Sequence, residues 1–187
     1  MSTAADGVRT VRLFGLDISA LDTTATVALL TDAAACPDGR GASYLATYAN
    51  PHTVLQARDD ARFAAELARF DLRYPDGVGL VWAARALGRP VAERVTASDF
   101  LPEFCVAVAR IRLPIYLLGG APGVAEAAGR RLGERAPGLR VVGTHHGYLE
   151  GLAEERAVAE RVRTSGAAAC LVAMGSPLQE RWILEHG

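Results

Sequence analysis

The chain has 187 residues, half of them apolar, and its 20 basic and 21 acidic residues give a net charge of -1. This length predicts a single domain of ordinary size, residues 1–187, with a substantial core. The balanced charge gives no reason to expect a nucleic-acid partner, because domains that bind nucleic acid usually show a basic excess.

The basic residues are all arginines, and the sequence contains no lysine. Without lysine there is no Schiff-base chemistry, which excludes lysine aldolases and pyridoxal-phosphate enzymes. A P-loop is excluded as well, and a protein kinase would lack the lysine of its third strand.

The three cysteines, Cys36, Cys105 and Cys170, are widely spaced and form no CxxC pair. We therefore expect neither a disulfide framework nor a zinc site. The first eight residues lack the apolar core of a signal peptide, and no run of about 18 apolar residues occurs. The expectation is a cytoplasmic protein with reduced thiols.

Short apolar runs alternate with amphipathic stretches along the chain. Strands are expected at residues 10–18 (one or two around Gly15), 43–48, 72–74, 115–118, 139–143 and 168–174. Helices are expected from the Asp22 cap to Ala35 and at 51–58, 60–69, 79–87, 99–110, 124–135 and 152–163, with a last one opening at residues 175–177. The strands are apolar throughout, which is typical of a parallel sheet with helices on both faces. The sequence predicts a doubly wound, Rossmann-like α/β fold with a mostly parallel sheet.

In such sheets ligands bind beyond the carboxyl ends of the strands. Five loops follow predicted strands, at residues 47–50, 75–79, 119–123, 143–148 and 175–180, and four of them are rich in glycine. Glycine lets backbone N–H groups approach an anion at a helix N-terminus. Together these loops predict a rim that binds a phosphate or nucleotide.

Asp76 lies between a predicted strand and helix in the run Pro75-Asp76-Gly77. One interpretation is an ordinary turn or N-cap aspartate. The other is a general base that takes a proton from an acceptor hydroxyl. Its position on the glycine-rich rim favours the general base.

Other chemistries are less well supported by the loops. The run Gly119-Gly120-Ala121-Pro122-Gly123 is not GxGxxG, and the position expected for a ribose-binding acid falls near Thr144 and His145. This argues against an NAD(P) oxidoreductase and against a methyltransferase. The absence of GxSxG argues against a serine hydrolase.

The histidines and one arginine can each be interpreted in two ways. His145 and His146 could bind a metal, but no HExxH motif or acidic cluster accompanies them, so we expect no metal. Arg94 is either part of a surface ion pair or a clamp for an anion.

Five motifs, taken in order, resemble the WecG/TagA/CpsF family of bacterial glycosyltransferases. They are Tyr74-Pro-Asp-Gly-Val-Gly79, Glu93-Arg-Val-Thr-Ala-Ser-Asp99, Leu117-Leu-Gly-Gly-Ala-Pro-Gly-Val-Ala-Glu126, Gly143-Thr-His-His-Gly-Tyr148 and Gly175-Ser-Pro-Leu-Gln-Glu-Arg-Trp182. The resemblance extends from about Gly15 to the end of the chain.

The resemblance implies an inverting glycosyltransferase that needs neither metal nor cofactor. The donor is a UDP-sugar, carrying N-acetylmannosamine or a relative, and the acceptor is a polyprenyl-diphosphate-linked sugar used for cell-wall or surface polysaccharide. By the same resemblance Asp76 is the catalytic base, and Asn50 lies near the acceptor with Thr47. The nucleotide pocket is expected to be lined by Gly147, Tyr148, Gly175, Ser176 and Gln179.

The sequence departs from the family pattern in three places. Tyr48 stands where the family has a threonine, although Thr47 is adjacent, and Ala97 replaces a glycine. The family normally continues beyond the equivalent of Gly187 with a strand, a helix and a basic appendage implicated in membrane docking. We therefore expect the C-terminal part of the family fold to be absent here, with peripheral membrane association only through that region.

The predicted mechanism is a single displacement. Backbone N–H groups and helix N-termini near Gly119, Gly120, Gly147 and Gly175 hold the nucleotide, Asp76 deprotonates the acceptor, and Arg94 meets the charge of departing UDP. The alternative is a nucleotide-binding module without catalysis in a polysaccharide assembly complex. Self-association into a homo-oligomer is also expected to be possible, because a chain that ends within a fold leaves surface uncovered.

Overall fold

The structure is a computed structural model that describes residues 8–36 and 43–187. The chain divides into two compact units, Met1–Leu101 and Pro102–Gly187. Each unit has an apolar core of its own. Helix α5, Ala97–Arg110, runs from the first unit into the second.

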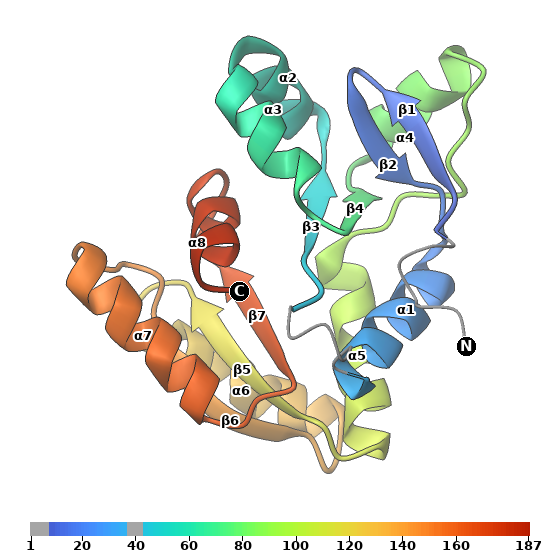
Figure 1. The fold of residues 1–187 in the computed structure, drawn as a ribbon. Helices are drawn as coiled ribbons and strands as arrows, with labels where there is room; N and C mark the ends of the chain where they lie inside the picture. Colours follow the sequence, from blue (N-terminus) through green and yellow to red (C-terminus); the bar gives the residue numbers. More distant parts are fainter. Residues whose placement is uncertain (1–7, 37–42) are drawn as a thin grey trace. The chain divides into compact units, whose positions relative to one another are not determined.

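The first unit contains two small sheets with helices (Figure 1). Strands β1 and β2 form an antiparallel hairpin, and β3 pairs in parallel with β4. The elements, in chain order, are β1 Thr10–Leu13, β2 Leu16–Ser19, α1 Thr23–Ala35, β3 Ala46–Ala49, α2 Pro51–Asp59, α3 Ala61–Ala68, β4 Leu72–Pro75 and α4 Val78–Ala86. Their shared core joins the hairpin, β3 and helices α2, α3 and α4.

Three helices of this unit begin at side-chain caps that the local sequence supplies. Asp22 accepts from the N–H of Ala25 at 2.7 Å, and Asp60 accepts from the N–H groups at the start of α3. Asn50 and Thr53 form a reciprocal capping box at the start of α2. Such caps satisfy N–H groups that have no partner inside the helix.

Phe14 and Gly15 form the turn between β1 and β2, and both have positive φ, 51° and 86°. A type I′ hairpin turn requires positive φ at both central residues and favours Asn-Gly. A left-handed backbone costs a residue that carries a Cβ roughly 1–2 kcal/mol. Phe14 nevertheless occupies this position with 53% of its surface exposed. The phenylalanine therefore carries a conformational cost that asparagine or glycine would avoid at this position.

Arg73 on β4 forms hydrogen bonds to several elements of the first unit. Its guanidinium donates to the carbonyl of Asp17 in β2 at 2.7 Å and to the carbonyl of Leu67 in α3 at 3.0 Å, and also to the carbonyl of Phe70. Desolvation lowers the pKa of Arg73 below its ordinary value. Three carbonyl acceptors compensate much of the cost of partly burying this charge.

The second unit is a three-stranded parallel sheet in the order β6-β5-β7. Its elements are β5 Pro114–Gly119, α6 Val124–Arg135, β6 Arg140–His145, α7 Leu152–Thr164, β7 Ala169–Ala173 and α8 Leu178–His186. The chain adds β6 on one side of β5 and then returns to add β7 on the other side. The carboxyl ends of β5 and β7 therefore form a topological switch point, where ligands of such sheets bind.

Helices cover both faces of this sheet (Figure 1). On one face Tyr116 and Leu118 of β5 pack with Val158 of α7 and Trp182 of α8. On the other face α6 approaches so closely that a Cβ on Gly129 would lie 3.4 Å from Leu117. The alternation of side chains along β5 produces the two layers.

The predicted α/β class and the parallel strand pairing are confirmed. Among the described residues, however, the strands bond into three sheets instead of one, and the first strand pair is an antiparallel hairpin. The strand expected at 43–48 is Ala46–Ala49. Just before it, Leu45 donates its N–H to the carboxylate of Asp71, and its carbonyl accepts from the N–H groups of Asp71 and Leu72. No helix in the described part of the chain is both long and apolar enough to cross a membrane.

Candidate active site

The carboxyl ends of β3 and β4 bring two of the predicted residues to adjacent positions. The last paired residues of the two strands are Ala49 and Pro75, so Asn50 and Asp76 follow side by side. The N–H of Asp76 donates to the carbonyl of Ala49 at 2.8 Å, which extends the ladder by one bond. Parallel pairing thus places both polar side chains at one edge of the sheet, where the sequence predicted a ligand rim.

The carboxylate of Asp76 is half-buried and receives one hydrogen bond from a side chain. Thr96 donates its hydroxyl to Oδ1 at 2.7 Å. Val95 positions that threonine, because its N–H bonds to the carbonyl of Pro75 at 2.8 Å. Oδ2 has no hydrogen bond among the residues that the structure describes. One oxygen is therefore held in place while the other is available to accept a proton, as a general base requires.

Two glycines set the backbone around Asp76. Gly77 has φ +90°, a conformation that residues with a Cβ rarely adopt. A Cβ on Gly79 would lie 3.2 Å from Cγ of Pro51, tighter than most contacts of this kind. The loop after β4 and the first turn of α4 therefore pack on the first turn of α2, which fixes Asp76 relative to Asn50.

Asn50 has a structural role in addition to the one predicted for it. Its Oδ1 accepts from the N–H of Thr53 at 2.9 Å, and the Thr53 hydroxyl accepts from the N–H of Asn50 at 2.9 Å. Because Oδ1 already accepts the capping bond, the side-chain amide nitrogen of Asn50 is the group that could contact the acceptor substrate.

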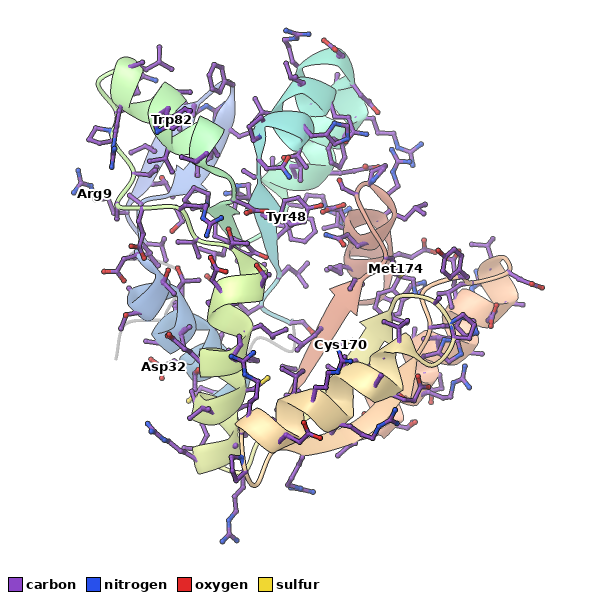
Figure 2. All side chains as sticks on the ribbon, turned by 180° about the vertical axis from the view of Figure 1, so that it is seen from behind. Arg9, Asp32, Tyr48, Trp82, Cys170 and Met174 are labelled. Carbon is purple, nitrogen blue, oxygen red and sulfur yellow. The ribbon has the colours of Figure 1, made fainter. Side chains whose placement is uncertain are left out.

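Thr47 and Tyr48 lie on opposite faces of β3, because side chains alternate along a strand. Thr47 is buried, with 3% of its surface exposed, inside the strand and not in the loop after it. The ring of Tyr48 lies 6.5 Å from that of Tyr74, which in turn meets Phe100 edge-on at 5.3 Å. The tyrosine found in place of the family's threonine thus belongs to an aromatic cluster on β3 and β4; Figure 2 shows Tyr48 on β3.

Arg94 forms an ion pair with Asp99, and both side chains are about half exposed. Of the two interpretations left open by the sequence, this geometry is the surface ion pair. A clamp on an anion would require Arg94 to exchange Asp99 for the ligand. Exposed pairs of this kind are worth only about 0–1 kcal/mol, so the exchange is cheap.

In the second unit the glycines predicted to bind a nucleotide pack against one another. A Cβ on Gly119 would lie 2.2 Å from the carbonyl oxygen of Ala173, and one on Gly147 would lie 3.0 Å from Cα of Gly119. The N–H of Gly120 donates to Ala173 at 3.0 Å, and that of Gly147 donates to the carbonyl of Gly120 at 2.8 Å. These N–H groups, expected to hold a diphosphate, are already bonded within the chain. The glycines allow three loops to close at the switch point, with Met174 beside them (Figure 2).

The loop after β7 carries a chain of hydrogen bonds. The N–H of Gly175 donates to Oε1 of Gln179 at 3.2 Å, and the amide of Gln179 donates to Oε1 of Glu180 at 3.0 Å. Gln179 and Glu180 are both buried. Glu180 was not singled out by sequence reasoning, although it lies inside the last matching motif.

Three more polar residues lie in these loops. The hydroxyl of Ser176 and Nδ1 of His146 are buried without a hydrogen-bond partner in the described structure. Buried polar atoms are rarely left unpaired, so a water or a ligand is the kind of partner that both atoms lack. Tyr148, in contrast, exposes 71% of its surface.

His145, His146 and Glu154 form a group of possible metal ligands. Their ligand atoms lie within 4.8 Å of one another. Two ligands at about 2.1 Å from one zinc ion can be at most about 4.2 Å apart, so this limit alone does not define a metal site. His145 Nδ1 also lies 2.9 Å from the carbonyl of His146. The expected absence of a metal remains a prediction.

The loops described above lie within the part of the chain that is similar to known proteins. Residues 11–187 match the model of the Glycosyl transferase WecG/TagA/CpsF family. The chain belongs to this family. Two similar relatives are named N-acetylglucosaminyldiphosphoundecaprenol N-acetyl-beta-D-mannosaminyltransferase. The one from Bacillus spizizenii is 27% identical over 138 residues, which are 74% of this chain and 52% of the relative. The one from Staphylococcus aureus is 31% identical over 139 residues, or 74% and 53%.

The WecG/TagA/CpsF match includes both strand-end groups, from Asn50 to Gln179. The chain spans about half the length of the curated relatives it matches. Thr96 is the residue beside Asp76 that sequence reasoning missed. Its signal is its place in the motif Glu93–Asp99, two residues after Arg94.

Proposed function

We propose that this chain transfers a sugar, N-acetylmannosamine or a relative, from a UDP-sugar to a polyprenyl-diphosphate-linked sugar, with inversion and without a metal. The observation that carries the proposal is the carboxylate of Asp76, which Thr96 holds at 2.7 Å at the ends of two parallel strands. Membership of the family supports the reaction class. The relatives' names support the acceptor and the sugar.

In this mechanism Oδ2 of Asp76 accepts the proton of the acceptor hydroxyl. The hydroxyl oxygen forms the new bond to the anomeric carbon as the bond from that carbon to the diphosphate oxygen breaks. The electron pair of the broken bond leaves with UDP. Attack opposite the leaving group inverts the anomeric centre.

The charge of the diphosphate needs a counterpart on the protein. Helices α6 and α8 begin at Gly123 and Pro177 without a side-chain cap. Uncapped first turns present N–H groups and the positive end of the helix dipole, which suit an anion. Ser176 and His146 add buried polar atoms in neighbouring loops. In the first unit, Arg94 is the residue proposed to meet an anionic charge, which requires it to exchange Asp99 for the ligand.

The test compares Asp76→Asn with wild type in a turnover assay containing a UDP-sugar and a prenyl-diphosphate-linked acceptor. Loss of a general base lowers turnover about 10²–10⁴-fold, while calorimetry is expected to show unchanged UDP binding. Asp32→Asn, at an exposed position on helix α1, makes the same chemical change away from the loops and is expected to leave turnover unaltered. Unchanged turnover in Asp76→Asn would remove this residue from the base role.

A nucleotide-binding module without catalysis is the second candidate. This candidate is supported by Tyr48, which occupies the position of the threonine in the family motif and packs against Tyr74. UDP binding without turnover by wild type, across a panel of UDP-sugars, favours the module. Turnover that depends on Asp76 favours the transferase.

A further inference from the structure

The first unit contains an apolar pocket of about 260 Å³ between the β1–β2 turn and helices α2 and α4. Six of its lining residues are apolar and come from the β1–β2 turn and helices α2 and α4: Phe14, Pro51, Val54, Leu55, Leu80 and Ala83. Pockets for complete drug-sized ligands measure roughly 300–1,000 Å³, so this one suits one segment of a larger ligand.

The pocket and the candidate active site share parts of their walls. Pro51, which lines the pocket, directly follows Asn50, and Gly79, also in the lining, follows Asp76 by three residues. These two wall residues pack on each other, because a Cβ added to Gly79 would lie 3.2 Å from Cγ of Pro51. The segments that carry Asn50 and Asp76 therefore continue into the walls of the pocket.

Phe14 is the residue of the lining that has an unusual backbone conformation. Its backbone has φ 51° in a turn that favours asparagine, and half of its surface stays exposed while it lines the pocket. Strained positions of this kind concentrate at ligand sites. Leu55, also in the lining, is 50% exposed.

The pocket also has a cation in its lining. Arg58 contributes to the wall, and its guanidinium pairs with Asp59 at 2.8 Å, with both side chains two-thirds exposed. Such an exposed pair is weak and exchanges readily for a ligand anion. An apolar recess with an exchangeable arginine matches a ligand that joins a hydrocarbon to a phosphate group.

We propose that this pocket binds the isoprene units nearest the diphosphate of the polyprenyl-diphosphate-linked acceptor. The inference rests on the proposed function for its choice of ligand. The isoprene units contact Phe14 and the faces of α2 and α4, and Arg58 meets the diphosphate.

The test measures the affinity of farnesyl diphosphate and of inorganic diphosphate for the chain by calorimetry. Each buried methylene strengthens binding, so farnesyl diphosphate is expected to bind at least about tenfold more tightly. Ala83→Leu fills the pocket from α4 and is expected to remove that advantage. Ala86→Leu makes the same change one turn along the helix at an exposed position outside the lining, and is expected to keep it.

Phe14→Asn separates binding from folding. Asparagine suits the left-handed turn better than phenylalanine, so the variant is expected to melt at the same or a higher temperature. Its affinity for farnesyl diphosphate is expected to fall about tenfold, with that for inorganic diphosphate unchanged. Equal affinities of the wild type for the two ligands would overturn the proposal, as would equal losses in Ala83→Leu and Ala86→Leu.

Sedimentation of the same variants tests whether a second copy of the chain fills the pocket instead. A change of oligomeric state in Ala83→Leu without loss of farnesyl diphosphate binding overturns the prenyl assignment. Failure of the proposed function has a different signature, because the wild type would then bind farnesyl diphosphate through the pocket and still transfer no sugar. If turnover depends on Asp76 but is the same in wild type and in the pocket variants, the prenyl assignment is wrong and the proposed function still stands.

Discussion

The strand ends of the two units are built in different ways. In the first unit polar side chains meet at the strand ends, with Asp76 held by Thr96 and Asn50 capping the next helix. In the second unit the backbone itself closes the loops, through Gly119, Gly120 and Gly147. The first arrangement provides groups for proton transfer. The second provides a closely packed surface in which a single added carbon atom has no room.

This contrast means that substitutions at the two strand ends have different consequences. A side chain such as Asp76 can be replaced by an isostere with the backbone intact, so the loss appears in activity. A glycine held against a carbonyl cannot be replaced without moving a strand, so the loss appears in stability.

The largest effect on stability is expected for Gly119→Ala. The added Cβ would lie 2.2 Å from the carbonyl oxygen of Ala173, at a backbone φ of +145°. Steric strain at a special backbone conformation is among the mechanisms behind the largest destabilisations, so we expect about 3–5 kcal/mol. Urea unfolding followed by circular dichroism measures it.

Gly133→Ala in α6 is the matched control. A Cβ there meets nothing within 4 Å, and alanine is the better helix former. We expect a stability gain of about 0.5–1 kcal/mol. If the two glycine variants have similar stabilities, the close packing of the second unit's loops is not the constraint described above.

A smaller effect is expected for Asn50→Ala in the first unit. The change removes the capping box at α2, and loss of an N-cap costs about 0.5–2 kcal/mol. Asp22→Ala at α1 removes a cap away from the candidate site and serves as control. Equal loss of stability in both variants, with loss of turnover only in Asn50→Ala, sharpens the assignment of Asn50 to acceptor binding. Loss of turnover in both variants would contradict it.

The smallest effect concerns the thiols. Burial raises the pKa of Cys105 to about 11 and that of Cys170 to about 12, from an ordinary value of 9.0. Cys36, in the first unit, is exposed. Because the thiolate is the reactive form, alkylation near pH 8 is expected to modify Cys36 first, with mass spectrometry as the readout. Comparable rates at all three thiols would show that the second unit opens readily.

The same shifts predict a loss of stability at high pH. Between about pH 9 and 11 the thiols ionise in the unfolded chain but stay protonated in the folded one, so the unfolded state binds fewer protons and stability falls as pH rises. Cys105→Ala is expected to reduce this dependence, measured as the urea midpoint against pH.

Much of the fold could be predicted because its signals are local. Helix α6, Val124–Arg135, begins and ends at the predicted residues, and Asp22 caps α1 as expected. The division of the strands into three sheets was not predicted, because an apolar run does not specify its partner. The roles assigned to the site residues remain predictions.

The sequence by itself determined the α/β alternation, the helix caps and the polar and glycine residues that follow the strands. These features depend on side-chain periodicity and on backbone preferences within a few residues. Only the tertiary structure decided that Thr96 bonds to Asp76, that Arg94 pairs with Asp99, and that the Phe14 turn meets α2 and α4 around a pocket. Those contacts depend on the path of the backbone between residues distant in sequence, which no local pattern specifies.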